Sequence, residues 1–122
     1  MKSSALTTTG FLLLFTLAQG ALGCATYRTC HCYDSDNVPN NNATQIACNG
    51  YSKEDTVFSE ERSECYYIGP AYKGNGWGWK WRGMDNCDFR KLCATAGATG
   101  PDSACTNKLP SNVADPVKPK GW

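Results

Sequence analysis

The stretch Cys24-Ala-Thr-Tyr-Arg-Thr-Cys-His-Cys-Tyr33 decides how this chain folds. Its residues favour a β-strand over 25–33, and the two-residue period of a strand places Cys30 and Cys32 on one face and His31 on the other. Cysteines that point the same way on one strand are too far apart to bond comfortably with each other. We therefore predict a strand that disulfides tie to other elements.

The whole cysteine set is even in number and lies downstream of residue 23. It comprises Cys24, Cys30, Cys32, Cys48, Cys65, Cys87, Cys93 and Cys105. In a chain of 122 residues, this pattern is typical of a disulfide framework built in an oxidising compartment. Such a set allows on the order of a hundred pairings, and the spacing does not select one of them.

The residues before Cys24 have the zones of a secretory leader. Lys2 supplies a positive start, Phe11 to Ala18 form an apolar run, and small residues allow cleavage after Gly20 or, alternatively, after Gly23. The run is too short to span a membrane core of about 30 Å. Bacterial lipidation of Cys24 would leave an odd number of thiols, which disfavours it. We predict a leader over 1–20, secretion to the extracellular space and no membrane anchor.

The charge balance of the remaining chain excludes one class of partner. The formal net charge of +1 falls to zero when the leader takes Lys2 with it, because the leader contains no acidic residue. A chain without net positive charge is not attracted in bulk to phosphate backbones. We therefore expect no nucleic-acid partner.

The pattern downstream predicts a small α+β domain over 24–107. We expect a helix over 42–50, which Asn42 caps and in which Ile46 and Cys48 point inward, then a polar loop over 51–62 and a strand over 63–68. A second helix begins at Asp85 or Asn86 and ends before Gly97. A short strand over 103–106 follows, and residues 108–122 read as a flexible, proline-containing tail. The predicted fold is a disulfide-stapled domain with two short helices packed on a short antiparallel sheet.

A tryptophan-rich ribbon is the sharpest candidate for a binding surface. Trp77, Trp79 and Trp81 alternate with Gly78 and Lys80, which places the three indoles on one face of an extended segment. Planar aromatic rings can stack on sugars or on a protein partner, and Lys80 and Arg82 would rim that face or add cation–π contacts. The alternative is that one or two indoles complete the small core.

The chain has few side chains suited to acid–base catalysis near neutral pH. His31 is the only histidine, and a strand residue between two framework cysteines is more simply structural. A ribonuclease of the fungal guanyl-specific type would need Glu, Arg and His side chains that converge on a sheet. Cys30, His31 and Cys32 do not suit a metal, because oxidised cysteines are not ligands and the histidine faces away. We expect no catalytic residue, no metal and no cofactor.

Asn42-Ala43-Thr44 is the only glycosylation sequon. It lies next to a turn, so a glycan at Asn42 is plausible in a eukaryotic secretory pathway. The same side chain is the expected cap of the helix over 42–50. The two roles partly exclude each other.

Two runs of the sequence carry a family resemblance. Cys30-His-Cys-Tyr-Asp-Ser-Asp-Asn-Val-Pro-Asn-Asn-Asn-Ala-Thr-Gln-Ile-Ala-Cys48 resembles small secreted cysteine-rich proteins of filamentous fungi, and so does Phe89-Arg-Lys-Leu-Cys93 with Gly97 and Ser103-Ala-Cys105. The resemblance covers residues 24–107 and rests mostly on cysteine spacing and turn residues. It implies an extracellular protein of the candidate-effector type, a virulence class with many non-enzymatic members, and it supplies no catalytic residues. The Trp77–Trp81 ribbon is not part of it.

Together these features predict a secreted, monomeric, effector-like protein. It would act outside the producing cell by binding a host or competitor extracellular protein, or a cell-wall polysaccharide, without enzymatic activity. The alternatives are a polysaccharide-binding protein that uses the tryptophan ribbon and a secreted antimicrobial toxin or ribonuclease-like enzyme.

Overall fold

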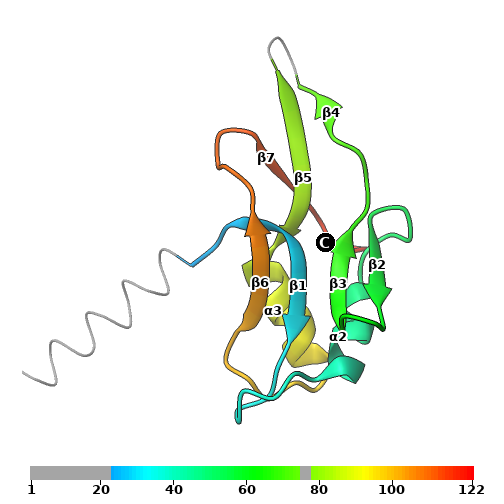
Figure 1. Ribbon diagram of the computed structural model, residues 1–122, viewed down its shortest axis with the longest axis vertical. Coiled ribbons are helices and arrows are strands. Elements are labelled where there is room, and N and C mark those ends of the chain that lie inside the picture. The colour runs from blue at the N-terminus through cyan, green and yellow to red at the C-terminus, as the bar shows by residue number, and fades with distance from the viewer. Residues whose placement is uncertain (1–22, 75–77) are drawn as a thin grey trace, which may run out of the picture.

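Strand β1 (Thr26–Cys32) is the centre of a mixed sheet in the computed structural model, which describes residues 23–74 and 78–122 (Figure 1). Along one edge β1 pairs antiparallel with β6 (Ser103–Lys108). Its other edge is shared by β5 (Trp79–Asp85) near its beginning and β3 (Glu64–Tyr67) near its end. The predicted strand over 25–33 is confirmed, and it contacts most of the sheet.

Three shorter strands complete the sheet. β2 (Thr56–Ser59) pairs with β3, β4 (Tyr72–Lys73) pairs with β5, and β7 (Ala114–Val117) runs parallel to β5. Over the described residues the sheet therefore has seven strands and one parallel pair. The α+β class is confirmed, whereas the prediction of a short, purely antiparallel sheet is wrong.

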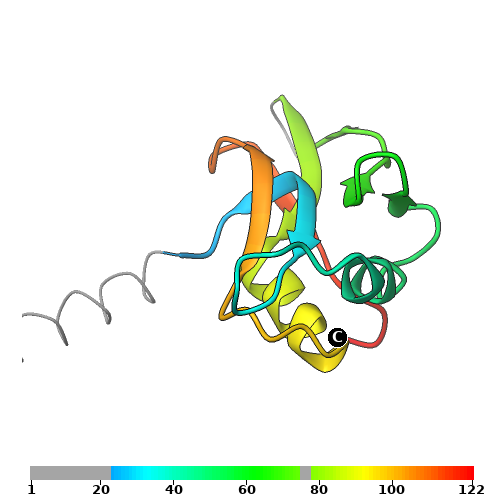
Figure 2. The same ribbon diagram turned by 60° about the horizontal axis from the view of Figure 1, so that its bottom comes forward.

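Helices α2 (Asn41–Cys48) and α3 (Asn86–Thr95) lie side by side on one side of the strands (Figure 2). Asp85 caps α3, as predicted, because its carboxylate accepts hydrogen bonds from the backbone N–H groups of Cys87 and Asp88. The cap of α2 is Asn40, whose Oδ1 accepts a 2.9 Å bond from the N–H of Ala43. The prediction that Asn42 caps this helix is therefore wrong.

All eight cysteines are paired in four disulfides. The bridges are Cys24–Cys87, Cys30–Cys105, Cys32–Cys93 and Cys48–Cys65. Three of them tie Cys24 and β1 to α3 and β6, and the fourth ties α2 to β3. The predicted framework is confirmed, including partners for Cys30 and Cys32 on other elements.

Disulfide sulfurs form much of the core. The largest completely buried apolar side chains are Tyr51, Phe89, Met84 and Val117, and the rings of Tyr51 and Phe89 stack with their centroids 6.4 Å apart. The half-cystines that line the same core are Cys30, Cys32, Cys48, Cys65 and Cys93. In so small a domain, these bridges replace apolar side chains that the chain lacks.

Two segments differ from the sequence-based expectation. Residues 51–62, predicted as a polar loop, contain β2, and the Thr56 side chain at its start is buried. Ile46, predicted to point inward, is 48% exposed on α2. Its outward position follows from the helical period, because Ala43, Thr44 and Ala47 occupy the buried face.

The C-terminal segment is also corrected, because it is an integral part of the fold. β7 buries Val117 against the core, and the N–H of Lys120 donates a 2.8 Å bond to the carbonyl of Gly50. The ammonium of Lys118 lies 3.3 Å from the buried carboxylate of Asp88. A loose tail over 108–122 with little to bury is therefore the wrong description.

The sheet divides at Arg28. Just before it, Tyr27 pairs with Met84 of β5, and just after it, Thr29 pairs with Tyr66 of β3. β3 and β5 diverge from this point. The chain then runs from β3 through residues 68–71 to β4, which pairs with β5 (Figure 1). We call the point at Arg28, where β1 changes its partner from β5 to β3, the strand fork. In residues 23–74 and 78–122, no helix is long and apolar enough to cross a membrane.

Candidate binding surface on the β4–β5 hairpin

The β4–β5 hairpin extends beyond the rest of the sheet (Figure 1). Its strands pair through Tyr72 with Lys80 and through Lys73 with Trp79. The N–H of Gly74 donates a 3.1 Å bond to the carbonyl of Gly78 and so closes the described part of the hairpin. Trp77 lies outside the described residues, and its place on the ribbon remains a prediction.

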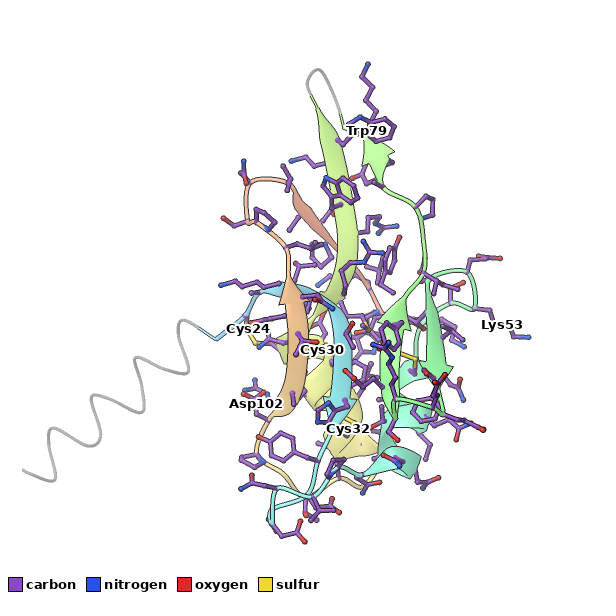
Figure 3. The ribbon with its side chains drawn as sticks, in the orientation of Figure 1. Cys24, Cys30, Cys32, Lys53, Trp79 and Asp102 are labelled. Carbon is purple, nitrogen blue, oxygen red and sulfur yellow. A yellow bond between two sulfur atoms is a disulfide. The ribbon has the colours of Figure 1, made fainter. Side chains whose placement is uncertain are left out.

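Trp79 and Trp81 both reach solvent. Their exposed fractions are 58% and 45%, and their spacing on β5 puts both side chains on one face of the strand. Figure 3 shows Trp79 near the free end of the hairpin, far from Cys30 and Cys32 in the middle of the sheet. For these two indoles the core-filling alternative is wrong, and the predicted exposed face is present.

The two basic residues of the predicted site belong to the opposite face. Register places Lys80 beside Tyr72, and the guanidinium of Arg82 lies over the Tyr72 ring at 6.0 Å. The Lys80 ammonium donates a 3.2 Å bond to the carbonyl of Asn112. The prediction that they rim the indole face is wrong, because neighbours on a strand alternate sides. Lys73, which pairs with Trp79, places a cation on the indole face.

The reverse face of the hairpin carries a linked polar group. The Tyr72 hydroxyl donates a 2.5 Å hydrogen bond to Oδ2 of Asp115, and Nε of Arg82 lies 3.4 Å from the same oxygen. The hydrogen bond to Asp115 raises the pKa of Tyr72, because the bond holds the phenol in its protonated form. The Arg82 and Asp115 side chains are 33% and 37% exposed, so solvent reaches this group.

At the strand fork a second arginine stacks on a second tyrosine. The Arg28 guanidinium lies 5.4 Å from the Tyr67 ring centroid, and its Nη2 donates a long, 3.4 Å bond to the Tyr67 carbonyl. Burial raises the pKa of the Tyr67 hydroxyl, Arg82 and Arg28 oppose this effect, and Asp55 and Asp115 reinforce it. The structure thus has one arginine–tyrosine pair at the fork and another on the hairpin.

Sequence reasoning missed these two arginine–tyrosine pairs. One signal was present, because alternation places Arg28 on the same face of β1 as Cys30, where a charge needs a partner. The sequence does not show that Arg28 contacts Tyr67 or that Tyr72 contacts Asp115, since these contacts join distant parts of the chain.

His31 lines a small pocket of about 80 Å³ together with Pro39, Arg62, Ser63 and Glu64. Continuing the register in which Cys30 faces Cys65 places His31 opposite Glu64. The structure thus brings together His31 and Glu64 on neighbouring strands and Arg62 in the turn between β2 and β3. Across the described part of the chain, no ion pair within 4.0 Å joins His31 to either charged neighbour.

A wider pocket of about 440 Å³ lies beside β2. Lys53 and Lys120 line it together with the apolar side chains of Val57, Phe58 and Ile68. Figure 3 shows Lys53 pointing outward from the body of the protein. No sequence motif marked this pocket, because its residues come from three separate segments.

One cluster contains residue types that bind metals, but its cysteines are not free to do so. Cys24, Asp85 and Cys87 place potential ligand atoms within 4.8 Å of one another. The two sulfurs are bonded to each other, and a metal needs a free thiolate. This cluster is a structural bridge beside a helix cap.

The glycosylation sequon lies on α2. Asn42 is exposed, whereas Thr44 is buried and its hydroxyl accepts a 2.9 Å bond from the N–H of Cys32. Because Asn40 provides the cap, a glycan on Asn42 would not remove it. The expected conflict between capping and glycosylation therefore does not arise.

No protein-family model, curated protein or solved structure matches this chain.

Proposed function

We propose that this is a secreted, effector-like binding protein that acts outside the producing cell on a host or a competitor. In this proposal the exposed indoles of Trp79 and Trp81 recognise the partner, with Lys73 beside them. The observation that carries the proposal is the exposure of both indoles on a hairpin that extends from a disulfide-stapled body. Exposed aromatic clusters usually mark interaction sites, because water disfavours them.

The four disulfides support an extracellular setting. Bridges of this density persist in oxidising compartments and are rare where glutathione keeps thiols reduced. The predicted leader over 1–20 and the resemblance to fungal cysteine-rich proteins support the same setting. The effector class in this proposal rests on that resemblance.

Two kinds of partner suit flat, exposed indoles. The residues Trp79 and Trp81 are two apart on one strand, so their attachment points lie about 7 Å apart. Such a pair can stack on neighbouring sugars of a cell-wall polysaccharide or bury itself in a protein interface. The experiment below has one arm for each.

The test compares wild type with Trp79→Ala/Trp81→Ala and with a matched control, Trp122→Ala. Trp122 is 55% exposed but lies at the C-terminus, where the Lys91 ammonium is 5.9 Å from its ring. Retention is measured on insoluble chitin, cellulose and β-glucan, then by binding to immobilised host extracellular proteins. We expect one support to retain wild type and the Trp122 variant and to lose the double variant. Equal retention of all three proteins would refute the proposal.

A ribonuclease-like activity is a second candidate, favoured by the pocket that His31, Arg62 and Glu64 share. Cleavage by transesterification needs a base to take the 2′-hydroxyl proton, an acid to protonate the leaving 5′-oxygen and a cation for the phosphate. Glu64, His31 and Arg62 respectively could fill these roles. RNA cleavage that is lost in His31→Ala and Glu64→Gln, and kept in Glu61→Gln, would establish it. No cleavage by the wild type would exclude it.

A further inference from the structure

The pocket beside β2 lies at an open edge of the sheet. β2 is the last strand in the order β2-β3-β1-β5-β4, so one of its edges has no partner strand. The N–H of Ile68 donates a 2.8 Å bond to the carbonyl of Asp55, and the antiparallel alternation then turns the N–H of Phe58 away from β3. Among the described residues no backbone carbonyl outside β3 accepts from this N–H. Because Phe58 lines the pocket, the open edge presents a backbone donor there.

The lining of the pocket combines exposed apolar side chains with a fixed aromatic ring. Val57 and Ile68, which are 47% and 53% exposed, line it together with Phe58. Tyr51 also lines it, and this side chain is held in place because it is buried and its ring stacks with that of Phe89. Exposed apolar side chains gathered around one hollow favour a ligand with an apolar part.

The charge of the pocket is positive. Both charged residues of its lining are lysines, Lys53 and Lys120, and a 2.8 Å bond from the N–H of Lys120 to the Gly50 carbonyl fixes the backbone there. In residues 23–74 and 78–122, no ion pair within 4.0 Å involves either ammonium. Glu54 does not line the pocket, and its carboxylate accepts a 3.1 Å bond from the Ser52 hydroxyl. Two cations beside one hollow favour an anion.

A cation or a docked peptide strand suits the pocket less well. The Cys48 carbonyl at the end of α2 already accepts bonds from the Tyr51 N–H and the Thr56 hydroxyl, at 3.2 and 3.0 Å. The N–H of Thr56 donates to the Ser52 carbonyl, which leaves a strand of four residues with too few open groups to pair with a peptide. Apolar contact, positive charge and one N–H donor together suit an amphipathic anion.

We propose that this pocket binds a small organic carboxylate with an apolar body, of the kind that a medium-chain fatty acid represents. The carboxylate is held by Lys53 and Lys120 and accepts from the N–H of Phe58, while the apolar body covers Val57 and Ile68. The volume of about 440 Å³ lies within the range of about 300–1,000 Å³ that is usual for small-molecule sites. The site is separate from the indole face, because its lining includes no residue of β4 or β5.

The test titrates isotope-labelled protein with sodium octanoate at pH 7 and follows the backbone amides by nuclear magnetic resonance. We expect the largest shifts at Phe58, Ile68 and Lys120. Three further probes separate the contributions, since 1-octanol lacks the charge, octylammonium reverses it, and acetate keeps the carboxylate without the apolar body. Each of them should bind about tenfold more weakly than octanoate, or worse.

Single variants assign the charge to the two lysines. Lys53→Gln and Lys120→Gln should each weaken octanoate binding about threefold and leave 1-octanol binding unchanged. Lys108→Gln is the matched control and should bind like wild type, because Lys108 is an exposed lysine of β6 outside this pocket. Trp79→Ala/Trp81→Ala should also bind octanoate like wild type. This proposal and that for the indole face can therefore fail independently.

Near-ultraviolet circular dichroism checks that each variant is folded. The proposal is overturned if octanoate shifts no amide of the pocket, if 1-octanol binds as tightly as octanoate, or if Lys108→Gln weakens binding as much as the two pocket variants do. Shifts confined to the β4–β5 hairpin would also overturn it, because they would assign the ligand to the indole face.

Discussion

The hydroxyl of Tyr72 donates a 2.5 Å hydrogen bond to Asp115, which lies 43 positions further along the chain. The two residues belong to β4 and β7, which both pair with β5, and Arg82 contacts each of them. This side-chain bond therefore adds to the pairing of β5 with β7 in holding the hairpin against the C-terminal strand. Because this hydrogen bond raises the pKa of Tyr72, it also makes the free energy of unfolding depend on pH.

Stability should fall as the pH rises beyond the usual tyrosine pKa of about 10. The hydrogen bond to Asp115 raises the pKa of Tyr72, and burial raises those of Tyr51 and Tyr67. A raised pKa in the folded state means that the protonated form is favoured. Its contribution is complete below pH 10 and is lost as the pH passes through the folded-state values. Urea unfolding from pH 7 to 11 measures this loss, and Tyr72→Phe should make it shallower. An identical slope in both proteins would contradict the assignment.

The four disulfides should give secreted protein a mass about eight daltons below its fully reduced mass, since each bond removes two hydrogens. Peptide mapping should find the pairings of the structure and a mature N-terminus after residue 20 or 23. Under mild reductant the Cys24–Cys87 bridge should open first, because Cys24 is exposed. Each of the other three bridges contains at least one completely buried cysteine. Timed alkylation with mass spectrometry checks the order, and early opening of Cys32–Cys93 would count against it.

Helix capping and glycosylation can be tested separately, because capping belongs to Asn40 and the sequon begins at Asn42. Asn40→Ala removes the bond to Ala43 and should lower the free energy of unfolding by about 1 kcal/mol. Asn42→Ala changes an exposed helix residue and should cost nothing measurable, while it abolishes any glycan in protein from a eukaryotic host. Urea unfolding and intact mass measure the two effects. A larger loss of stability in Asn42→Ala would restore Asn42 as the cap.

The C-terminal strand should contribute to stability. Val117→Ala removes two buried methyl groups from the core and should cost about 2 kcal/mol. Val38→Ala is the matched control, because Val38 is 55% exposed, and its effect should stay within about 0.5 kcal/mol. Equal unfolding midpoints for both variants would mean that the segment after residue 108 is loose, as the sequence alone suggested.

The sequence predicted the features that depend on local chemistry. The alternation around Cys30 and Cys32 indicated β1, and Asp85 marked the beginning of α3 through its capping side chain. The shared face of Trp79 and Trp81 also follows from a local pattern, because residues two apart on a strand point the same way. Their exposure does not follow from that pattern, since the core-filling alternative fitted it equally well. Each of these predictions needs only neighbouring residues.

The missed elements depend on distant partners. β2 and β7 are short outer strands with few apolar residues, so neither has a strong pattern of its own. Pro116 argued against a strand, but β7 pairs with β5 alone, and an outer strand tolerates a residue without an N–H donor. The contact between Arg28 and Tyr67 was missed for the same reason, since the two residues lie 39 positions apart.

β1 is synthesised before the other strands, yet its partners arrive much later. Its two cysteines bond with residues 75 and 61 positions further along the chain, and β6, which covers one whole edge, comes after nearly everything else. A ribosome adding about 5–20 residues per second leaves Cys30 and Cys32 without their partners for several seconds. During that delay, the thiols of Cys30 and Cys32 meet the cysteines at 48 and 65 before their own partners. Efficient production should therefore depend on an isomerase that corrects these premature bonds, and yield from a heterologous host should respond to isomerase supply more than to codon choice.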